Sequence, residues 1–295
     1  MPDSPNPLRA AHYADGARFA RAVVVENVRL ARDTYRVRVA CPTLASDIRP
    51  GQFVMLRLAG GDDPLIGRAL ALYDTYAGDD GTAEGLDLVY LVVGKLTRRL
   101  ASAGAGTQVD LWGPLGNGFP PISTDHLILV AGGIGHTPFL AVARQWLGSK
   151  RYGTGGEQAG AGRVTLCYGT RSRELVSCVD DYISAGVDVR VSTDDGTEGR
   201  PGLVTDDVRE LLASTAGSQE DRHIFCCGPE PMMEATAGVA REFHVPCHVS
   251  LETPMACGVG ICFSCVARVR QPDGSWDYKR TCVDGPIFDA PAIVW

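Results

Sequence analysis

Four cysteines near the end of the chain have the spacing of iron ligands. They follow C-x4-C-x2-C, with the fourth cysteine after sixteen further residues, and are Cys257, Cys262, Cys265 and Cys282. This is the plant-type spacing of a [2Fe–2S] cluster. Gly258 and Gly260 lie between the first two cysteines, where a loop around a cluster needs positive φ values and N–H groups turned toward sulfur. The pattern therefore predicts a [2Fe–2S] site.

A structural zinc site is the alternative for the same cysteines. Zinc sites usually show paired C-x2-C units, and this segment has one such pair, Cys262 and Cys265. The chain has 10 cysteines, and the other six are scattered along it. In an acidic chain without an apparent secretory signal, clustered cysteines indicate metal ligands in a reducing, cytoplasmic compartment. A zinc-stabilised binding module therefore stays open beside the iron–sulfur interpretation.

A glycine-rich turn after the apolar run 127–131 is the second segment suited to chemistry. Gly133 and Gly135 lead into Thr137 and Pro138, which the sequence predicts as the N-cap and the first residue of a helix. Close backbone approach at a helix N-terminus suits a pyrophosphate. The turn lacks the G-x-G-x-x-G pattern, so a glycine turn that serves packing alone is the alternative.

Three weaker signals accompany these two. The turn Cys227-Gly228-Pro229 follows an apolar run, and ligands bind at the carboxyl ends of parallel strands in open α/β sheets. Arg68 begins another apolar run. Its guanidinium either binds a diphosphate through two hydrogen bonds or is a solvated side chain at the end of a strand. The segment 194–196 is expected to form a turn, with a ribose hydroxyl as its possible contact. Each of the three, taken alone, also fits a purely structural role.

The elements that must position these residues change type along the chain. Residues 1–20 are rich in Pro, Ala and Asp and are predicted to be a flexible extension. Residues 21–124 contain short β-type runs separated by Gly, Pro and Asp, with one helix-like stretch at 96–103. Several short strands at close spacing predict an antiparallel β-barrel.

Residues 125–243 alternate instead between apolar strands and helices. This alternation predicts a parallel sheet with crossover helices, a Rossmann-like α/β domain. The low-complexity segment 153–162 is expected to be a surface loop, and residues 244–295 form a third, cysteine-rich unit. The predicted strands are 126–130, 164–168, 187–191 and 223–227, and the predicted helices are 138–147, 175–185, 206–213 and 231–243.

Composition narrows the classes of function. The chain has 295 residues, 45% of them hydrophobic, which predicts about two domains with sizeable cores. Its formal net charge is -7 without a basic stripe, so we expect no nucleic-acid binding. Because no apolar stretch reaches the roughly 18 residues of a spanning helix, we expect no membrane insertion.

Taken in order, these segments resemble the ferredoxin-reductase superfamily, in which a flavin-binding barrel precedes a nicotinamide-binding α/β domain. With the cysteine-rich unit, the chain resembles the electron-transfer subunits of type B dihydroorotate dehydrogenase from about residue 21 to 290. The most specific parts are 251–257 and 280–290. The resemblance implies a multidomain fold: a flavin-binding barrel (21–124), an NAD-binding α/β domain (125–243) and a small [2Fe–2S] domain (244–295).

The resemblance also implies which positions bind FAD and NAD(H). Three of them depart from the family pattern: Ala69 replaces a proline, Ala71 removes a serine hydroxyl expected near the flavin ring, and Leu96 replaces a glycine. These departures affect the redox properties of the flavin. The backbone hydrogen-bond donors to the flavin remain. The implied FAD positions are Arg68, Ala69, Leu70, Ala71, Val89, Tyr90, Leu91, Leu96 and Thr97, and the implied NAD(H) positions are Gly133, Gly135, Thr137, Cys227, Gly228 and Pro229.

The activity implied by the resemblance is an NAD-linked oxidoreductase. NADH gives hydride to FAD, and electrons then pass singly through the [2Fe–2S] cluster to the FMN of a dihydroorotate dehydrogenase catalytic subunit, within a heterotetramer of pyrimidine biosynthesis. No catalytic nucleophile–base pair is expected. A related reductase that serves a sulfide dehydrogenase, glutamate synthase or hydrogenase partner is the alternative. Arg171 and Arg173 follow the second α/β strand and leave NADPH open beside NADH.

Overall fold

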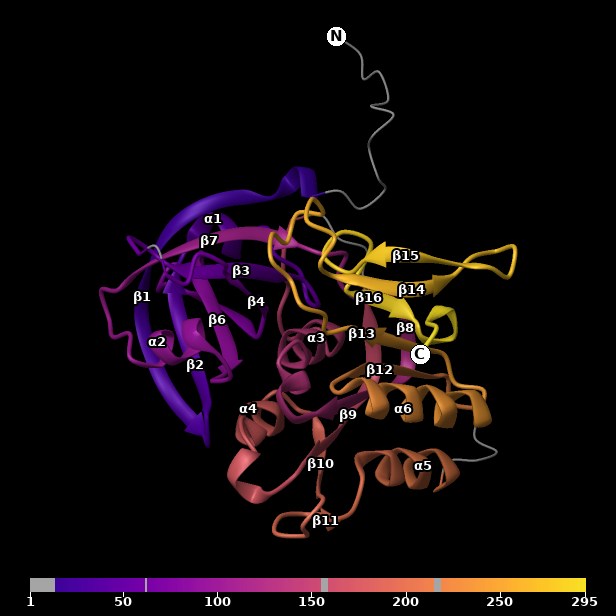
Figure 1. The fold of residues 1–295 in the computed structure, drawn as a ribbon. Helices are drawn as coiled ribbons and strands as arrows, with labels where there is room; N and C mark the ends of the chain where they lie inside the picture. Colours follow the sequence, from indigo (N-terminus) through magenta and orange to yellow (C-terminus); the bar gives the residue numbers. More distant parts are fainter. Residues whose placement is uncertain (1–13, 62, 155–158, 215–218) are drawn as a thin grey trace.

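The computed structural model of the protein describes residues 14–61, 63–154, 159–214 and 219–295. Within these residues the chain forms two seven-stranded sheets and one two-stranded sheet. Figure 1 shows the first sheet in indigo and purple, the second in magenta to orange with its edge strand β16 in yellow, and the rest of the C-terminal segment in yellow beside them. The predicted fold class, a β-barrel followed by an α/β domain and a small C-terminal unit, is confirmed.

The first sheet is antiparallel and curves round on itself. Its strand order is β4-β3-β7-β1-β2-β6-β5. The two outermost strands, β4 and β5, are separated in the chain by Leu72 and Tyr73 alone, which requires the sheet to close into a barrel-like shape. The strands are β1 (Arg18–Ala31), β2 (Thr34–Ala40), β3 (Phe53–Leu58), β4 (Arg68–Ala71), β5 (Asp74–Ala77), β6 (Ala83–Leu91) and β7 (Gln108–Leu115).

Alternation of side chains along these strands builds the barrel core. Successive residues of a strand face opposite sides, so residues two positions apart share a face. Val37 and Val39 of β2 both point inward and are 0% exposed. The helices α1 (Pro42–Ala45) and α2 (Lys95–Ala101) contribute Leu44 and Leu100 to this core. Residues 18–20, expected in the flexible extension, instead begin β1 and pair with β7, while residues 1–13 lie outside the described residues.

The second sheet is parallel except at one edge. Its order is β11-β10-β9-β8-β12-β13-β16, and β16 alone runs antiparallel to its neighbour. The strands are β8 (Ser123–Gly132), β9 (Gly160–Thr170), β10 (Asp188–Thr193), β11 (Arg200–Pro201), β12 (Arg222–Cys227), β13 (Cys247–Ser250) and β16 (Ile287–Asp289). All four predicted strands are present, and β9 begins inside the segment 153–162 that was expected to be a loop.

Helices cover both faces of this sheet. α3 (Phe139–Trp146) and α4 (Val179–Ser184) pack with Leu127 and Leu129, while α5 (Val204–Ser214) and α6 (Glu230–Glu242) pack with Ile128 and Val130. Neighbouring residues of β8 therefore serve opposite faces, as expected for a strand buried on both sides. In the part of the chain that the structure describes, no helix is both long and apolar enough to cross a membrane.

The C-terminal unit is not separate from the second sheet. The predicted unit begins at residue 244 and so contains β13 and β16. Both are strands of the α/β sheet, because β13 pairs with β12 and β16 pairs with β13. The rest of the unit is the cysteine loop and a hairpin of β14 (Val266–Arg270) and β15 (Trp276–Arg280). Phe53 and Met55 of the barrel form one core cluster with Cys265 and Cys282, so the cysteine loop packs against the barrel as well.

Candidate functional site

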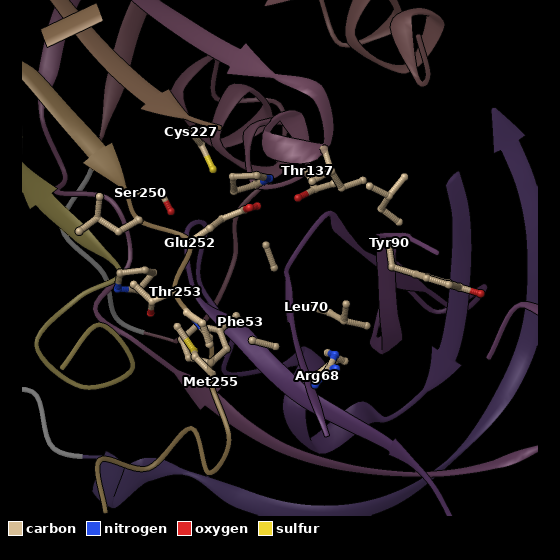
Figure 2. Close-up of a pocket in the computed structure, with 18 of the residues that line it drawn as sticks. Phe53, Arg68, Leu70, Tyr90, Thr137, Cys227, Ser250, Glu252, Thr253 and Met255 are labelled. Atoms are coloured by element: carbon tan, nitrogen blue, oxygen red, sulfur yellow. The ribbon is translucent and has the colours of Figure 1, made fainter. Parts of the chain in front are cut away.

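A cavity of about 700 Å³ lies where the barrel, the parallel sheet and the C-terminal segment meet. Figure 2 shows Arg68 and Tyr90 on the barrel side, Thr137 and Cys227 on the side of the parallel sheet, and the segment 250–256 between them. β12 and β13 reach the cavity with their last residues, Cys227 and Ser250, at the edge where open α/β sheets bind ligands. The cavity is within the size range of cofactor sites.

The barrel wall contains eight of the nine positions predicted to bind FAD. Those that line the cavity are Arg68, Ala69, Leu70, Ala71, Val89, Tyr90, Leu91 and Thr97. Leu96 differs, because its side chain is buried in the barrel core. The Thr97 hydroxyl is already engaged, since it accepts the backbone N–H groups of Val93 and Gly94 at 3.0 Å each.

Arg68 places a positive charge at the end of this wall. Its guanidinium donates to the neighbouring Gly67 carbonyl at 3.4 Å and lies beside Gly94. Among the described residues, no carboxylate forms an ion pair with it. A guanidinium without an acidic partner that faces a cavity is suited to bidentate binding of a phosphate.

The two predicted nucleotide turns pack directly on each other. A Cβ at Gly135 would lie 2.2 Å from the Cys227 carbonyl oxygen, so only glycine permits this contact. Gly133 has a φ of +54°, a conformation that also favours glycine. Neither glycine lines the cavity, whereas Thr137 and Cys227 do. The glycines therefore shape the turn, and the residues that follow it face the cavity.

The predicted N-cap at Thr137 is wrong. A 3-10 turn over Gly133–His136 precedes α3, and Thr137 already has helical angles, φ −56° and ψ −35°. Its N–H donates to the Ile134 carbonyl at 3.1 Å, so the tighter turn satisfies it. Pro138 rather than Thr137 occupies the N-cap position, which leaves the Thr137 side chain facing the cavity.

The turn that follows β12 is divided between two cavities. Cys227 lines the large one, whereas Gly228 and Pro229 line a neighbouring cavity of about 450 Å³. The segment 251–253 lies between the two cavities and lines both. Gly228 and Pro229 therefore do not line the large cavity beside Cys227, although Gly228 packs against the other glycine turn.

Glu252 is a cavity residue that sequence reasoning missed. It follows β13, whose Ser250 pairs with Cys227 of β12, so both strands end at the same edge. In Figure 2 its side chain extends into the cavity toward Thr137. The Glu252 side chain is exposed to the cavity, but the surrounding protein limits its contact with bulk water. This desolvation raises the pKa of its carboxyl group. Burial likewise raises the pKa of the Cys227 thiol, and the nearby Glu252 charge adds to this. The alternating apolar and polar residues of 247–251, a strand pattern that ends just before Glu252, were the available signal.

The two arginines considered for a 2′-phosphate, Arg171 and Arg173, follow the carboxyl end of β9. The Arg173 guanidinium donates to the Glu198 carboxylate at 2.8 Å, and its backbone N–H donates to Thr197. Asp195 accepts from the N–H and hydroxyl of the same Thr197 and is exposed. The charge of Arg173 is therefore balanced by an acid of the neighbouring loop.

The four predicted cysteines form two pairs, Cys265 with Cys282 and Cys257 with Cys262, but within the described residues no three of them are gathered into a ready metal-binding group. The sulfurs of Cys265 and Cys282 are 3.2 Å apart, and this contact lowers the pKa of Cys265 to about 6 while it raises that of Cys282. The pKa of Cys262 is also lowered to about 6, first by hydrogen bonds from Ser264 and then by those from Cys257. Thiols with lowered pKa values form the thiolates that ligate metals.

The loop between the first two cysteines has the backbone expected for a cluster. Gly258 and Gly260 have φ values of +74° and +82°. The Val259 N–H donates to the Cys257 sulfur at 3.4 Å, and the Gly260 backbone N–H lies near the Cys282 sulfur and favours its negatively charged form. Two thiol pairs with amide donors fit two irons better than the single ion of a zinc site.

One residue joins the cavity to the cysteines. Ser264 lines the cavity, and its hydroxyl lies 3.1 Å from the Cys262 sulfur and accepts the Ala256 N–H at 3.2 Å. Asn117, just after β7, ties β16 to the barrel, because its side-chain amide donates to the Ile287 carbonyl at 2.8 Å and accepts the Ile287 N–H at 3.1 Å. The cavity and the cysteine loop are thus parts of one site.

Comparisons with known protein families agree with this division. Residues 252–294 match the iron–sulfur cluster binding domain of dihydroorotate dehydrogenase B, and residues 129–238 match the oxidoreductase NAD-binding domain. The first match contains all four cysteines, and the second contains both nucleotide turns.

Solved structures with the same fold include flavin-linked reductases. A structure of the NADH-dependent reduced ferredoxin–NADP oxidoreductase, described for flavin-based electron bifurcation, is 28% identical with a TM-score of 0.75, over 94% of this chain and 90% of that one. Phthalate dioxygenase reductase is 18% identical with a TM-score of 0.58, over 90% of this chain and 94% of that one, and shows the fold alone.

Curated relatives match along nearly the whole chain. The electron transfer subunit of dihydroorotate dehydrogenase B (NAD(+)) from Fusobacterium nucleatum is 32% identical over 92% of this chain and 96% of that protein. The subunit of the same name from Geobacillus kaustophilus is 34% identical over 93% of this chain and 98% of its own. Together with the barrel, the parallel sheet and the paired cysteines, these matches show that the chain belongs to the family of dihydroorotate dehydrogenase B electron-transfer subunits, which are NAD-linked oxidoreductases.

Proposed function

We propose that this chain carries electrons from NADH, through FAD and a [2Fe–2S] cluster, to the FMN of a dihydroorotate dehydrogenase catalytic subunit. The observation that carries the proposal is Ser264, which lines the cavity and contacts Cys262. It supports a short path from the cavity to the cysteines. When bound, the flavin takes up a hydride as two electrons, and the cluster transfers one electron at a time.

On the barrel side, residues of this chain would bind and orient FAD. Arg68 would hold a phosphate of the cofactor, since its guanidinium faces the cavity and has no acidic partner among the described residues. Ala69–Ala71 and Val89–Leu91 would contact it mainly through backbone groups and small apolar side chains. With Ala71 at the position of the family serine, no hydroxyl is offered there to the flavin ring.

On the side of the parallel sheet, the same cavity would position the nicotinamide. Thr137 and Glu252 place a hydroxyl and a carboxylate there, which suits the amide of a nicotinamide ring. Desolvation by the surrounding protein raises the pKa of this carboxyl group above its ordinary value. At the other end, the ion pair of Arg173 with Glu198 leaves this arginine occupied and supports NADH over NADPH.

The partner would approach the exposed cluster loop. Ile261 and Phe263 flank Cys262 and are 72% and 62% exposed, so the loop presents apolar side chains at the place where electrons would leave. A heterotetramer with the catalytic subunit and a cytoplasmic location are part of this proposal, and the free thiols of the described cysteines suit a reducing compartment. A sulfide dehydrogenase, glutamate synthase or hydrogenase partner would use the same residues.

Paired assays on Cys265→Ser test the proposal. Anaerobic bleaching of the flavin absorbance by NADH should persist, because the cavity is retained, and NAD-linked orotate formation with the partner present should collapse. Cys41→Ser, in the barrel core away from the cysteine loop, is the matched control and should pass both assays. Normal orotate formation by a variant that lacks the cluster signal would refute the relay. Parent protein that reduces another acceptor and never the FMN subunit would favour the alternative partner.

A further inference from the structure

Arg280 is a charged side chain in direct contact with the cysteine loop. It is the last residue of β15 and stands two positions before Cys282. Its Nη1 donates to the Gly260 carbonyl oxygen at 3.0 Å, and its guanidinium carbon lies 5.3 Å from the centre of the Phe263 ring. The guanidinium therefore touches the loop at two points, one on each side of Cys262.

The peptide at Gly260 links this arginine to a ligand sulfur. Its carbonyl oxygen accepts from Arg280, and its backbone N–H lies near the Cys282 sulfur, where it favours the negatively charged form of that sulfur. The packing leaves no room for another residue, since a Cβ at Gly260 would lie 2.6 Å from Val283 Cγ2 and 3.2 Å from Arg280 Nη1. Arg280 thus holds a peptide whose N–H lies near Cys282.

Asp284 keeps the arginine in place without covering it. Its carboxylate accepts the Arg280 backbone N–H at 2.9 Å and lies 3.7 Å from Arg280 Nε. The Arg280 side chain is 22% exposed, so water screens its charge only in part. A fixed positive charge on Arg280 and an amide N–H near the cysteine sulfurs both stabilise negative charge that is added to a group bound by these sulfurs.

We propose that Arg280 is a positioning residue that raises the reduction potential of the cluster held by the four cysteines. Reduction adds one electron, supplied by the flavin, and hence one negative charge to the cluster, with no bond or proton exchanged at Arg280. The guanidinium stabilises that charge directly and, through Gly260, keeps an N–H directed at Cys282. This inference rests on the proposed cluster site and is independent of which partner accepts the electrons.

The test is the midpoint potential of the cluster, followed by its EPR signal in a redox titration of the holoprotein without partner. Arg280→Gln removes the charge, and Arg280→Lys keeps a charge but loses the planar fork. Arg268→Gln is the matched control, because Arg268 lies on the paired strand β14, 5.9 Å from the Trp276 ring, and donates to Trp295 rather than to the cysteine loop.

We expect Arg280→Gln to shift the potential to more negative values, Arg280→Lys to shift it less, and Arg268→Gln to leave it at the parent value. Equal potentials in all four proteins would overturn the inference. If Arg280→Gln fails to retain the cluster, the lysine variant decides, and an unchanged potential there also overturns it. A parent protein without a [2Fe–2S] signal would instead refute the proposed cluster site, which separates the two failures.

Discussion

The indole N–H of Trp112 donates a hydrogen bond of 2.8 Å to the carbonyl oxygen of Cys257. Trp112 lies on β7 of the barrel, and Cys257 is the first of the four clustered cysteines. The same loop is tight at the next residue, since a Cβ at Gly258 would lie 2.6 Å from Met55 Cγ of β3. The barrel therefore provides both a polar anchor and an apolar support for the cysteine loop.

Trp112→Phe should weaken the cysteine loop and leave the barrel intact. Phenylalanine keeps most of the ring packing and removes the N–H, which costs about 1 kcal/mol for one neutral hydrogen bond. We expect faster loss of the iron–sulfur absorbance in a chelator, with an unchanged flavin content. Trp276→Phe, on the exposed hairpin, is the control and should lose its cluster at the parent rate.

Arg68→Ala should weaken FAD binding by roughly ten- to hundredfold. One charge-assisted hydrogen bond to an anion contributes about 1.5–3 kcal/mol, and 1.4 kcal/mol corresponds to a factor of ten. The measurement is the flavin dissociation constant after removal and titration of FAD. Arg57→Ala is the control, because Arg57 lies on the adjacent strand β3 and bonds to Asp110 outside the cavity. Equal affinities in parent and Arg68→Ala would identify Arg68 as a solvated arginine.

Asp74 joins the barrel to the α/β domain, and Asp74→Asn should loosen that junction. Its buried carboxylate on β5 accepts from Lys150 at 2.7 Å and from Tyr152 at 2.6 Å, and it pairs with Arg144 of α3. Loss of the Asp74 charge leaves the cations Lys150 and Arg144 without a counter-charge, which lowers the free energy of unfolding by on the order of 3 kcal/mol. We expect a lower unfolding temperature together with slower reduction of the flavin by NADH.

Asp63→Asn is the matched control for this junction. Asp63 pairs with Lys95, but both side chains are more than half exposed, so little stability depends on the pair. A parent-like unfolding temperature in Asp74→Asn would contradict the role of Asp74, whereas a lowered one in both variants would indicate a general charge effect.

Stability should fall as the pH falls from about 6.5 to 4. Burial lowers the pKa of His126 to about 4, below its usual 6.5, so the unfolded chain binds a proton in this range that the folded chain does not. The stability that depends on neutral His126 is fully present above pH 6.5 and is lost toward pH 4. Over that range the free energy of unfolding falls by about 1.4 kcal/mol per pH unit. Burial also lowers the pKa of His223 to about 4, which adds to the slope.

His126→Gln should make this pH dependence shallower. The glutamine no longer titrates and is able to replace the hydrogen bond of 2.9 Å between His126 and Thr165. The measurement is the free energy of unfolding in urea at pH 7.5, 6 and 5, compared with the parent protein. Equal slopes would show that His126 gains its proton without unfolding.

Local features of the fold and site were predictable from sequence. Strands and helices follow hydrophobic periodicity, which depends on near neighbours, and all four predicted α/β strands are present. The positive φ values of Gly258 and Gly260 were also expected, because they follow from the residue type within a short loop. Thr137 was misassigned because a 3-10 turn, which periodicity does not reveal, took the start of the helix.

The sequence by itself determined the barrel and α/β pattern, the four cysteines and the family, because these depend on residue type and short spacing. Only the tertiary structure decided which residues share the cavity. It brought Glu252 next to Cys227, assigned Gly228 to a second cavity, and joined Trp112 to Cys257 across 145 positions. Such contacts depend on how two sheets pack against each other, and the packing of distant side chains leaves no periodic signal along the chain.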